Sequence, residues 1–317
     1  MTDPSPVPRV SRAKVATTVI GVLIALAAGA FVARTLLRDR HQISEALAGA
    51  SPGWIALAAG LAVVGMTAIA VPWRQAIRVF GDDLPLSQVI ARYFVGEIGK
   101  YLPGGVWPIL GRGELATRWG VRRPAAYGSV VLSLLTLYLG AMSVVVLGLP
   151  ALVSGGDGPG PVVVVALLPL GLAALHPAVL RRLLRQAERV SRRPIELVIP
   201  SWGTSVSLVV RYVPAWLAIG GATWAVARAL DPQAPLLEVG TAAVLSWVVG
   251  FVLVPVPGGV GVREAAFVAA AGSLDPGIAA AVALAARALF VLVDAAGAVL
   301  GSLALRRLAL RRSGAER

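Results

Sequence analysis

Two copies of the short sequence Pro-Gly-Gly-Val are each followed by an arginine and a glutamate. These residues are Arg112 and Glu114 after the first copy, and Arg263 and Glu264 after the second. A guanidinium group presents a planar fork of donors that matches phosphate oxygens. A carboxylate can hold such an arginine in place when no ligand is bound, or contact a cationic or hydroxylated headgroup. The repeated pattern therefore predicts a site for an anionic group, with these four residues as its first candidates.

The two copies themselves break apolar stretches of the chain, Leu86–Leu110 and Val256–Ser273. Proline removes a backbone donor and paired glycines relax the backbone, so helices are interrupted there. A broken segment at membrane depth must face protein or water, and transporters use paired broken helices to build binding sites. Two helix-ending turns at the membrane surface, with no function, are the alternative. The residues concerned are Pro103, Gly104 and Gly105, and Pro257, Gly258 and Gly259.

Four further ionisable residues lie in or beside apolar segments, where charge is costly and usually functional. Glu97 and Lys100 are three residues apart before the first broken element and can pair locally. Arg287 and Asp294 lie within the last apolar segment, about 10 Å apart on one helix face. We predict that all four belong to the same substrate-binding site. The structural alternative is that the Arg–Glu pairs only lock two halves of the protein together.

Composition shows which elements must position these residues. The 317 residues are 57% hydrophobic and only 14% charged, with a mean hydropathy of +0.79. Soluble domains carry about 25% charged residues, so a soluble or disordered chain is excluded. The net charge of +13 could indicate nucleic-acid binding, but arginine-rich cytoplasmic loops explain it more simply in a chain this apolar.

Hydropathy predicts an all-α, polytopic membrane bundle of about eight helices. The expected crossings are Val15–Ala33, Trp54–Val71, Ala126–Leu149, Val162–Leu175, Ser205–Ala227, Val239–Pro255, Val262–Ser273 and Gly277–Leu305. Whether the broken elements are re-entrant or full crossings is left open. We expect a single membrane domain, 15–305, with repeat halves at about 54–175 and 205–305.

Arginine distribution predicts the orientation. The loop 176–204 is rich in arginine, and the tails 1–14 and 306–317 are rich in basic residues. Both termini are therefore expected in the cytoplasm, and the protein in the cytoplasmic membrane. Within that loop, apolar residues from Val179 to Val190 recur at helical spacing between arginines. This pattern predicts an amphipathic helix on the inner leaflet, although a loop that only fixes orientation fits equally well.

Several kinds of chemistry are not expected. The chain has no cysteine and two histidines, His41 and His176, each beside an apolar segment. Thiolate chemistry is therefore absent, and no metal site or other cofactor is predicted. No P-loop sequence occurs, so movement of a substrate would be passive, ion-coupled or dependent on a partner.

The two motifs carry a family resemblance. The stretch Gly96-Glu-Ile-Gly-Lys-Tyr-Leu-Pro-Gly-Gly-Val-Trp107 and the stretch Val254-Pro-Val-Pro-Gly-Gly-Val-Gly-Val-Arg-Glu264 resemble motifs of the lysylphosphatidylglycerol synthase transmembrane-region family. The resemblance implies an eight-helix membrane domain that moves a lipid between leaflets. Bifunctional members also carry a soluble aminoacyl transferase domain. This chain ends at Arg317, just after the last apolar segment, so lipid aminoacylation is not expected of it.

Taken with the anion site, the resemblance predicts a non-enzymatic lipid flippase whose partners are membrane lipids and not nucleic acid. The arginines predict that these lipids are anionic. The alternatives are a small-solute secondary transporter, a lipid-modifying membrane enzyme, and a non-catalytic scaffold for a lipid-processing protein partner. The oligomeric state is not predicted.

Overall fold

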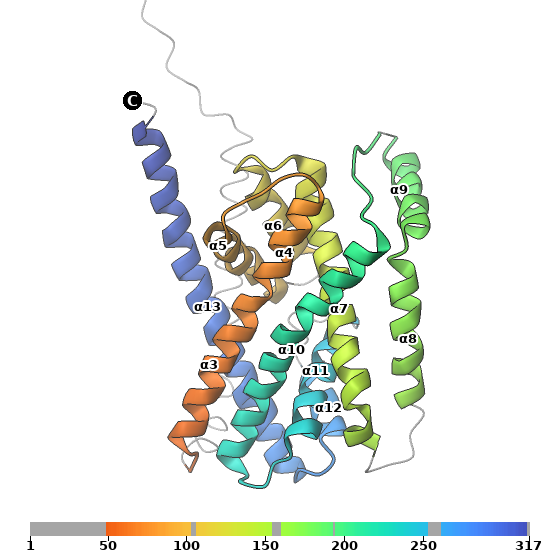
Figure 1. Ribbon diagram of the computed structural model, residues 1–317. Helices are drawn as coiled ribbons and strands as arrows, with labels where there is room; N and C mark the ends of the chain where they lie inside the picture. Colours follow the sequence, from red (N-terminus) through yellow and green to blue (C-terminus); the bar gives the residue numbers. More distant parts are fainter. Residues whose placement is uncertain (1–48, 103–105, 154–159, 193, 253–260, 316–317) are drawn as a thin grey trace, which may run out of the picture.

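The computed structural model describes residues 49–102, 106–153, 160–192, 194–252 and 261–315, and all their regular structure is helical (Figure 1). The prediction of an all-α membrane bundle is confirmed. The elements are α3 (Pro52–Ala68), α4 (Ala70–Val79), α5 (Leu86–Glu97), the 3-10 helix η1 (Ile98–Tyr101), α6 (Trp107–Thr117), α7 (Arg123–Val153), α8 (Gly160–Ala174), α9 (Pro177–Ser191), α10 (Trp202–Leu230), α11 (Leu236–Val252), α12 (Val262–Ala270) and α13 (Pro276–Ala315).

Four stretches of the described chain are long and apolar enough to cross a membrane. They are α3 with α4 (Pro52–Val79), then Arg123–Leu152, Trp202–Leu230 and Pro276–Arg311. The pair α8 and α9, bent by 67°, could make a fifth. Each of the four contains a segment predicted from hydropathy, because some 20 apolar residues in helical form span the hydrocarbon layer. The predicted first crossing, Val15–Ala33, lies outside the described residues.

Helix α10 is the centre of the bundle and packs against α3, α7, α11 and α13. Its buried residues include Tyr212, Trp216 and Ile219. The contact with α11 is close because both helices carry glycine there: a Cβ on Gly220 would lie 2.8 Å from the carbonyl oxygen of Gly240. Small residues at such crossings let membrane helices approach closely.

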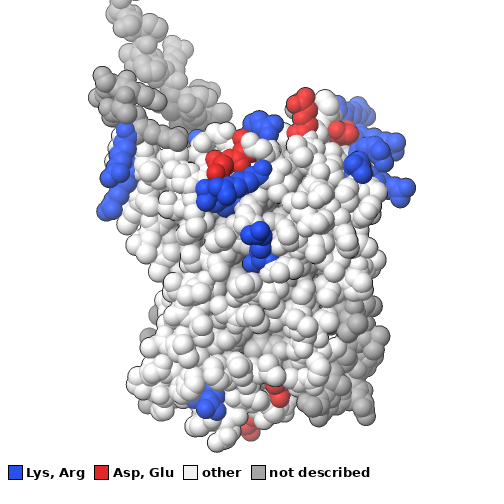
Figure 2. Space-filling model, in the orientation of Figure 1, with Lys and Arg blue, Asp and Glu red and all other residues white. Residues whose placement is uncertain are grey.

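Most charged side chains on the face in Figure 2 gather at one end of the bundle, and few occur along its length. We call this the basic end. Helix α4 ends there and α7 begins there, and helix α9 and the end of α13 lie there as well (Figure 1). At the opposite end α3, α11 and α13 begin and α10 ends; the backbone amide of Ser51 donates to the carbonyl of Ala229 at this end.

Two helical hairpins enter the bundle from opposite ends. The pair α5–α6 enters from the basic end, and η1 follows α5 at its deep end (Figure 1). The pair α11–α12 enters from the opposite end, and α12 returns towards the end where α13 begins. Helix α12 has nine residues and is therefore about 13 Å long, less than half the hydrocarbon thickness. The expected crossing at Val262–Ser273 therefore does not form, and the segment turns back instead.

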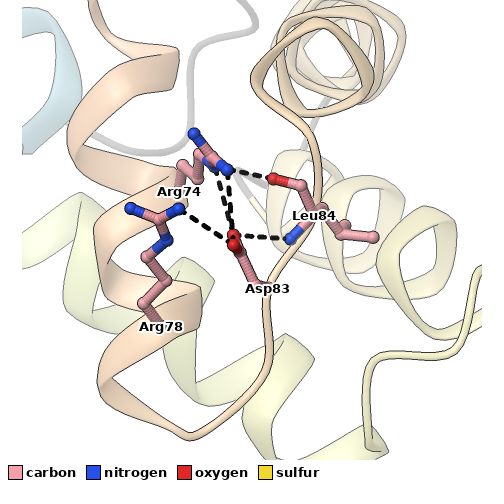
Figure 3. A network of polar contacts seen from close by, with 4 residues as sticks. All are labelled: Arg74, Arg78, Asp83 and Leu84. Carbon is pink, nitrogen blue, oxygen red and sulfur yellow. Dashed lines mark hydrogen bonds and ion pairs between the residues drawn. The ribbon is translucent and has the colours of Figure 1, made fainter.

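An acidic clamp fixes the connection between α4 and α5 (Figure 3). The side chain of Asp83 pairs with Arg78 at 2.9 Å and with Arg74 at 3.1 Å, and it accepts the backbone amide of Leu84. Arg74 also donates to the carbonyl of Leu84 at 2.7 Å. The hydrogen bond from Arg78, supported by Arg74 and by the Leu84 amide, holds the pKa of Asp83 well below its ordinary value. The clamp sets where α5 enters the bundle.

The predicted amphipathic helix is present as α9. Its side chains Val179, Leu183 and Val190 are exposed, and the 67° bend carries its axis away from that of α8. His176 begins the helix, and its Nδ1 accepts the backbone amide of Ala178 at 3.3 Å. Contact of α9 with a lipid surface stays a prediction.

Candidate functional site

A buried carboxylate on α13 is bound by the deep end of the first hairpin. Asp294 is fully buried, and its Oδ2 lies 2.7 Å from the ammonium of Lys100. The same oxygen accepts a hydrogen bond of 2.7 Å from the hydroxyl of Tyr101. Both donors belong to η1, where the helix α5 tightens before the first broken element. The contact therefore ties the tip of this hairpin to the last membrane helix.

A second carboxylate, Glu97, lies between two cations of the same hairpin. Its Oε1 is 3.9 Å from Lys100 and its Oε2 is 3.8 Å from the Nε of Arg112. Arg112 is fully buried and its guanidinium lies over the rings of Trp73 and Tyr93, at 5.5 and 5.6 Å from their centroids. Neither of its terminal nitrogens has a hydrogen-bond partner among the described residues. An unpaired buried donor is costly, and an anionic ligand would supply the acceptors that these N–H groups lack.

Glycine makes this burial possible. A Cβ on Gly96 would lie 2.6 Å from the Cγ and 2.9 Å from the backbone nitrogen of Arg112. Helices α5 and α6 can therefore meet closely only without a side chain at this position.

The second hairpin contacts α13 about two turns nearer the opposite end, at Arg287 rather than Asp294. The Oε1 of Glu264 accepts a hydrogen bond of 2.5 Å from the Nη1 of Arg287. Its Oε2 accepts the backbone amide of Gly261 at 2.6 Å and so caps the first turn of α12. Gly261 has a φ of +79°, which favours glycine. A cavity of about 20 Å³, large enough for one water molecule, lies beside this pair and is lined by Thr223, Ser246 and Arg263 among others.

Trp247 on α11 brings the two hairpins together. The guanidinium of Arg263 stacks on its ring at 3.5 Å from the centroid, and Lys100 lies 5.5 Å from the same centroid. The Nε of Arg263 is buried without a hydrogen-bond partner in the described part of the chain. Gly250 leaves space for this arginine, because a Cβ there would lie within 2.9 Å of its Cδ. The indole ring of Trp247 thus contacts one cation from each hairpin, Lys100 and Arg263.

The site lies near the middle of the bundle. The ring of Trp247 packs edge-on against Trp216, which is halfway along α10, and against Phe290 of α13. Tyr138, halfway along α7, contacts Trp216 as well. Helices α6 and α12 both begin at this depth, so the positive ends of two helix dipoles add to the arginines.

The structure brings together seven of the eight candidate residues. Glu114 is the exception: it lies on the surface of the basic end and pairs with Arg118 at 3.3 Å and Arg123 at 3.7 Å. Arg112 therefore pairs with Glu97 rather than with the nearer residue in the sequence. Arg263 and Glu264 do not act as a pair either, since one stacks on Trp247 and the other binds Arg287. The six broken-element residues Pro103, Gly104, Gly105, Pro257, Gly258 and Gly259 lie outside the described residues.

Sequence reasoning missed the aromatic part of the site. Tyr101 lies inside the first motif and Trp247 lies just before the second, but apolar segments contain many aromatic residues without a binding role. Trp73 and Tyr93, which surround Arg112, come from α4 and α5 and gave no signal. These four aromatic residues come from four helices, α4, α5, η1 and α11, so only the packing of those helices identifies them.

The fold and this charged centre define a class: a multi-pass, all-α membrane protein with a polar site at mid-depth between two opposed helical hairpins. The chain matches the family described as lysylphosphatidylglycerol synthase TM region over residues 18–301, and it belongs to that family. The resemblance identified from the two motifs is thereby confirmed, and it indicates a lipid-related role in the membrane. No curated protein matches the chain.

Proposed function

We propose that this protein is a non-enzymatic lipid flippase that moves an anionic phospholipid, or a lipid-linked anionic headgroup, between the leaflets of the cytoplasmic membrane. The single observation that carries the proposal is the mid-depth site, where cations of both hairpins meet on Trp247. The basic end would face the cytoplasm, as would both termini, because arginine-rich ends are retained there.

The charge balance of the site supports an anionic ligand. Counted by formal charge alone, its cations are Lys100, Arg112, Arg263 and Arg287, and its carboxylates are Glu97, Glu264 and Asp294. The site therefore carries one positive charge in excess. Arg112 and Arg263 also keep buried N–H donors without hydrogen bonds in the described structure. A phosphate would supply both the missing charge and the missing acceptors.

The opposed hairpins suggest how a headgroup would pass. One reaches the site from each end of the bundle, so movement of either would open the site towards one leaflet. The acyl chains would stay in the bilayer while the headgroup passes between the hairpins. The carboxylates would bind the arginines when no lipid is present and release them to the phosphate.

The test is exchange of labelled phospholipid between leaflets in liposomes that contain the purified protein. Arg263→Gln and Arg112→Gln remove one cation each from the site, and we expect each to slow exchange at least tenfold relative to the wild type, as about 1.4 kcal/mol of lost binding implies. Arg118→Gln removes a cation from an exposed pair at the basic end and should leave exchange unchanged.

Two results would overturn the proposal. The first is wild-type protein that does not accelerate exchange of anionic lipids over protein-free liposomes. The second is exchange that all three variants support equally. Uptake of a soluble anion that depends on Arg263, without lipid exchange, would instead establish a small-solute transporter. A co-purifying lipid-processing enzyme with neither activity would indicate a scaffold.

A further inference from the structure

A deep apolar groove of about 510 Å³ lies between α3, α5 and α13, separate from the charged centre. Its walls include Val63 and Thr67 of α3, Ile90 and Phe94 of α5, and Ala296 and Leu300 of α13. The floor forms where α5 and α13 approach closely: a Cβ on Gly301 would lie 2.7 Å from the carbonyl oxygen of Ala91.

The length of the groove matches one leaflet. On α13 it extends over thirteen residues, from Leu292 to Ala304, and the twelve steps between them make about 18 Å of helix. Half of the hydrocarbon layer of a bilayer is about 15 Å thick. A single acyl chain from the leaflet at the basic end would therefore fill the groove along its length.

Two arginines continue the groove towards the basic end. At 100° per residue, Arg307 and Arg311 lie on the same face of α13 as Ala296, Leu300 and Ala304. Arg307 comes one turn after Ala304 and Arg311 two turns after it. Both side chains are exposed, and neither forms an ion pair within the described residues, unlike Arg74, Arg78 and Arg118 at the same end. They would meet the phosphate of a lipid whose chain fills the groove.

The apolar segment Val15–Ala33 of this chain is the competing occupant, and its charge fits less well. Arg9, Arg12 and Lys14 precede it, and Arg34, Arg38 and Arg40 follow it. Whichever end of this segment lay at the basic end, it would bring cations beside Arg307 and Arg311, and neighbouring like charges repel. An anionic lipid has the opposite charge and the right length.

We propose that this groove is a binding site for one acyl chain of an anionic phospholipid, and that Arg307 and Arg311 hold the phosphate at its mouth. The site goes beyond the translocation proposal and stands without it. It lies at the protein surface within one leaflet, whereas the charged centre lies between the hairpins.

The experiment measures lipid retained by the intact protein in native mass spectrometry after release from nanodiscs. The two probes are phosphatidylglycerol and phosphatidylcholine with the same acyl chains. Arg307→Gln should reduce retained phosphatidylglycerol about fivefold, and Arg307→Gln with Arg311→Gln about 25-fold, because each arginine that contacts the anionic headgroup contributes about one such factor. Retention of phosphatidylcholine should change much less, because its choline cation offsets the charge of its phosphate.

Matched controls separate this site from general attraction of lipid. Arg306→Gln removes the same charge from the neighbouring position, which faces away from the groove, and should retain phosphatidylglycerol as the wild type does. Ala296→Phe fills the groove and should reduce retention of both lipids, whereas Val299→Phe, on the face exposed to bilayer, should not. The exposed arginine variants keep the test valid if the phenylalanine variant fails to fold.

Equal retention by the Arg306 and Arg307 variants would overturn the proposal, as would equal retention of the two lipids by the wild type. The natural absence of cysteine allows a direct test of the other occupant. Ready cross-linking of the double variant Leu23→Cys and Ala296→Cys in membranes that contain phosphatidylglycerol would place the N-terminal segment in the groove and also overturn the proposal. Because no transport is measured, failure of lipid exchange in liposomes does not affect the result.

Discussion

Replacement of Asp294 by asparagine tests the central ion pair of the site. The change keeps the size of the side chain and an oxygen that can accept from Tyr101, but it removes the charge 2.7 Å from Lys100. At an effective dielectric constant of about 20, two unit charges at this separation attract by about 6 kcal/mol. Burial of both groups offsets part of this, and breaking such a pair by losing one partner costs about 3–5 kcal/mol.

Local geometry places the expected loss at the lower end of that range. Lys100 is 16% exposed and lies 3.9 Å from Glu97, so it can pair with that carboxylate when Asp294 is neutral. We therefore expect Asp294→Asn to lower the free energy of unfolding by about 3 kcal/mol. Lys100→Met in the same chain removes the unpaired charge and should return stability to within about 1 kcal/mol of the wild type. Glu114→Gln, at an exposed pair with Arg118, should cost less than about 1 kcal/mol.

The assay is equilibrium unfolding in mixed micelles, followed by the fluorescence of the eight tryptophans. A loss below about 1 kcal/mol for Asp294→Asn, or no recovery in the double variant, would refute the reasoning. Lipid exchange by the double variant then separates two roles of the pair. Restored stability with restored exchange indicates a structural lock, and restored stability without exchange indicates that the charges act on the substrate.

Three further changes probe other parts of the structure. Gly250→Ala places a Cβ where the aliphatic part of Arg263 lies, so it should displace that arginine from Trp247 and slow lipid exchange. Gly60→Ala, with no atom within 4 Å of the new Cβ, should leave exchange intact. Equal effects of the two variants on exchange would contradict this. Trp247→Leu removes the ring shared by Arg263 and Lys100 and should slow exchange more than Trp247→Phe does, since only phenylalanine keeps a ring face for a cation; the opposite order would count against the stacking. Asp83→Asn should lower the thermal stability at neutral pH. The pKa of Asp83 in the folded protein lies below its ordinary value of about 3.9, so the carboxylate stabilises the protein fully above that pH. This contribution is lost as the pH falls below that value, and the difference in melting temperature between wild type and variant should therefore shrink in acid. A difference that grows in acid would contradict the clamp.

Much of the helical framework could be predicted from the sequence because its causes are local. A run of apolar residues dictates a membrane helix wherever it occurs, and the predicted segments within α3–α4, α7, α10 and α13 are present. The charged residues Arg287 and Asp294 could be predicted as site candidates for a local reason as well, since they interrupt an apolar helix. The short length of α12 could not be predicted in the same way. The sequence indicated a break before Val262, but not whether the following segment would cross the membrane or return to the end from which α11 enters.

The order of amino acids was enough to identify a helical membrane protein of the lysylphosphatidylglycerol synthase TM-region family, with two broken elements and a set of ionisable residues that are costly in lipid. Which of these residues meet depends on how the helices pack. Tyr101 bonds Asp294 across 193 positions of sequence, Glu264 binds Arg287 rather than its neighbour Arg263, and Glu114 lies apart at the surface. The physical reason is that apolar length and helix-breaking residues act within one segment, whereas the partners of a buried charge depend on how separate helices pack around it.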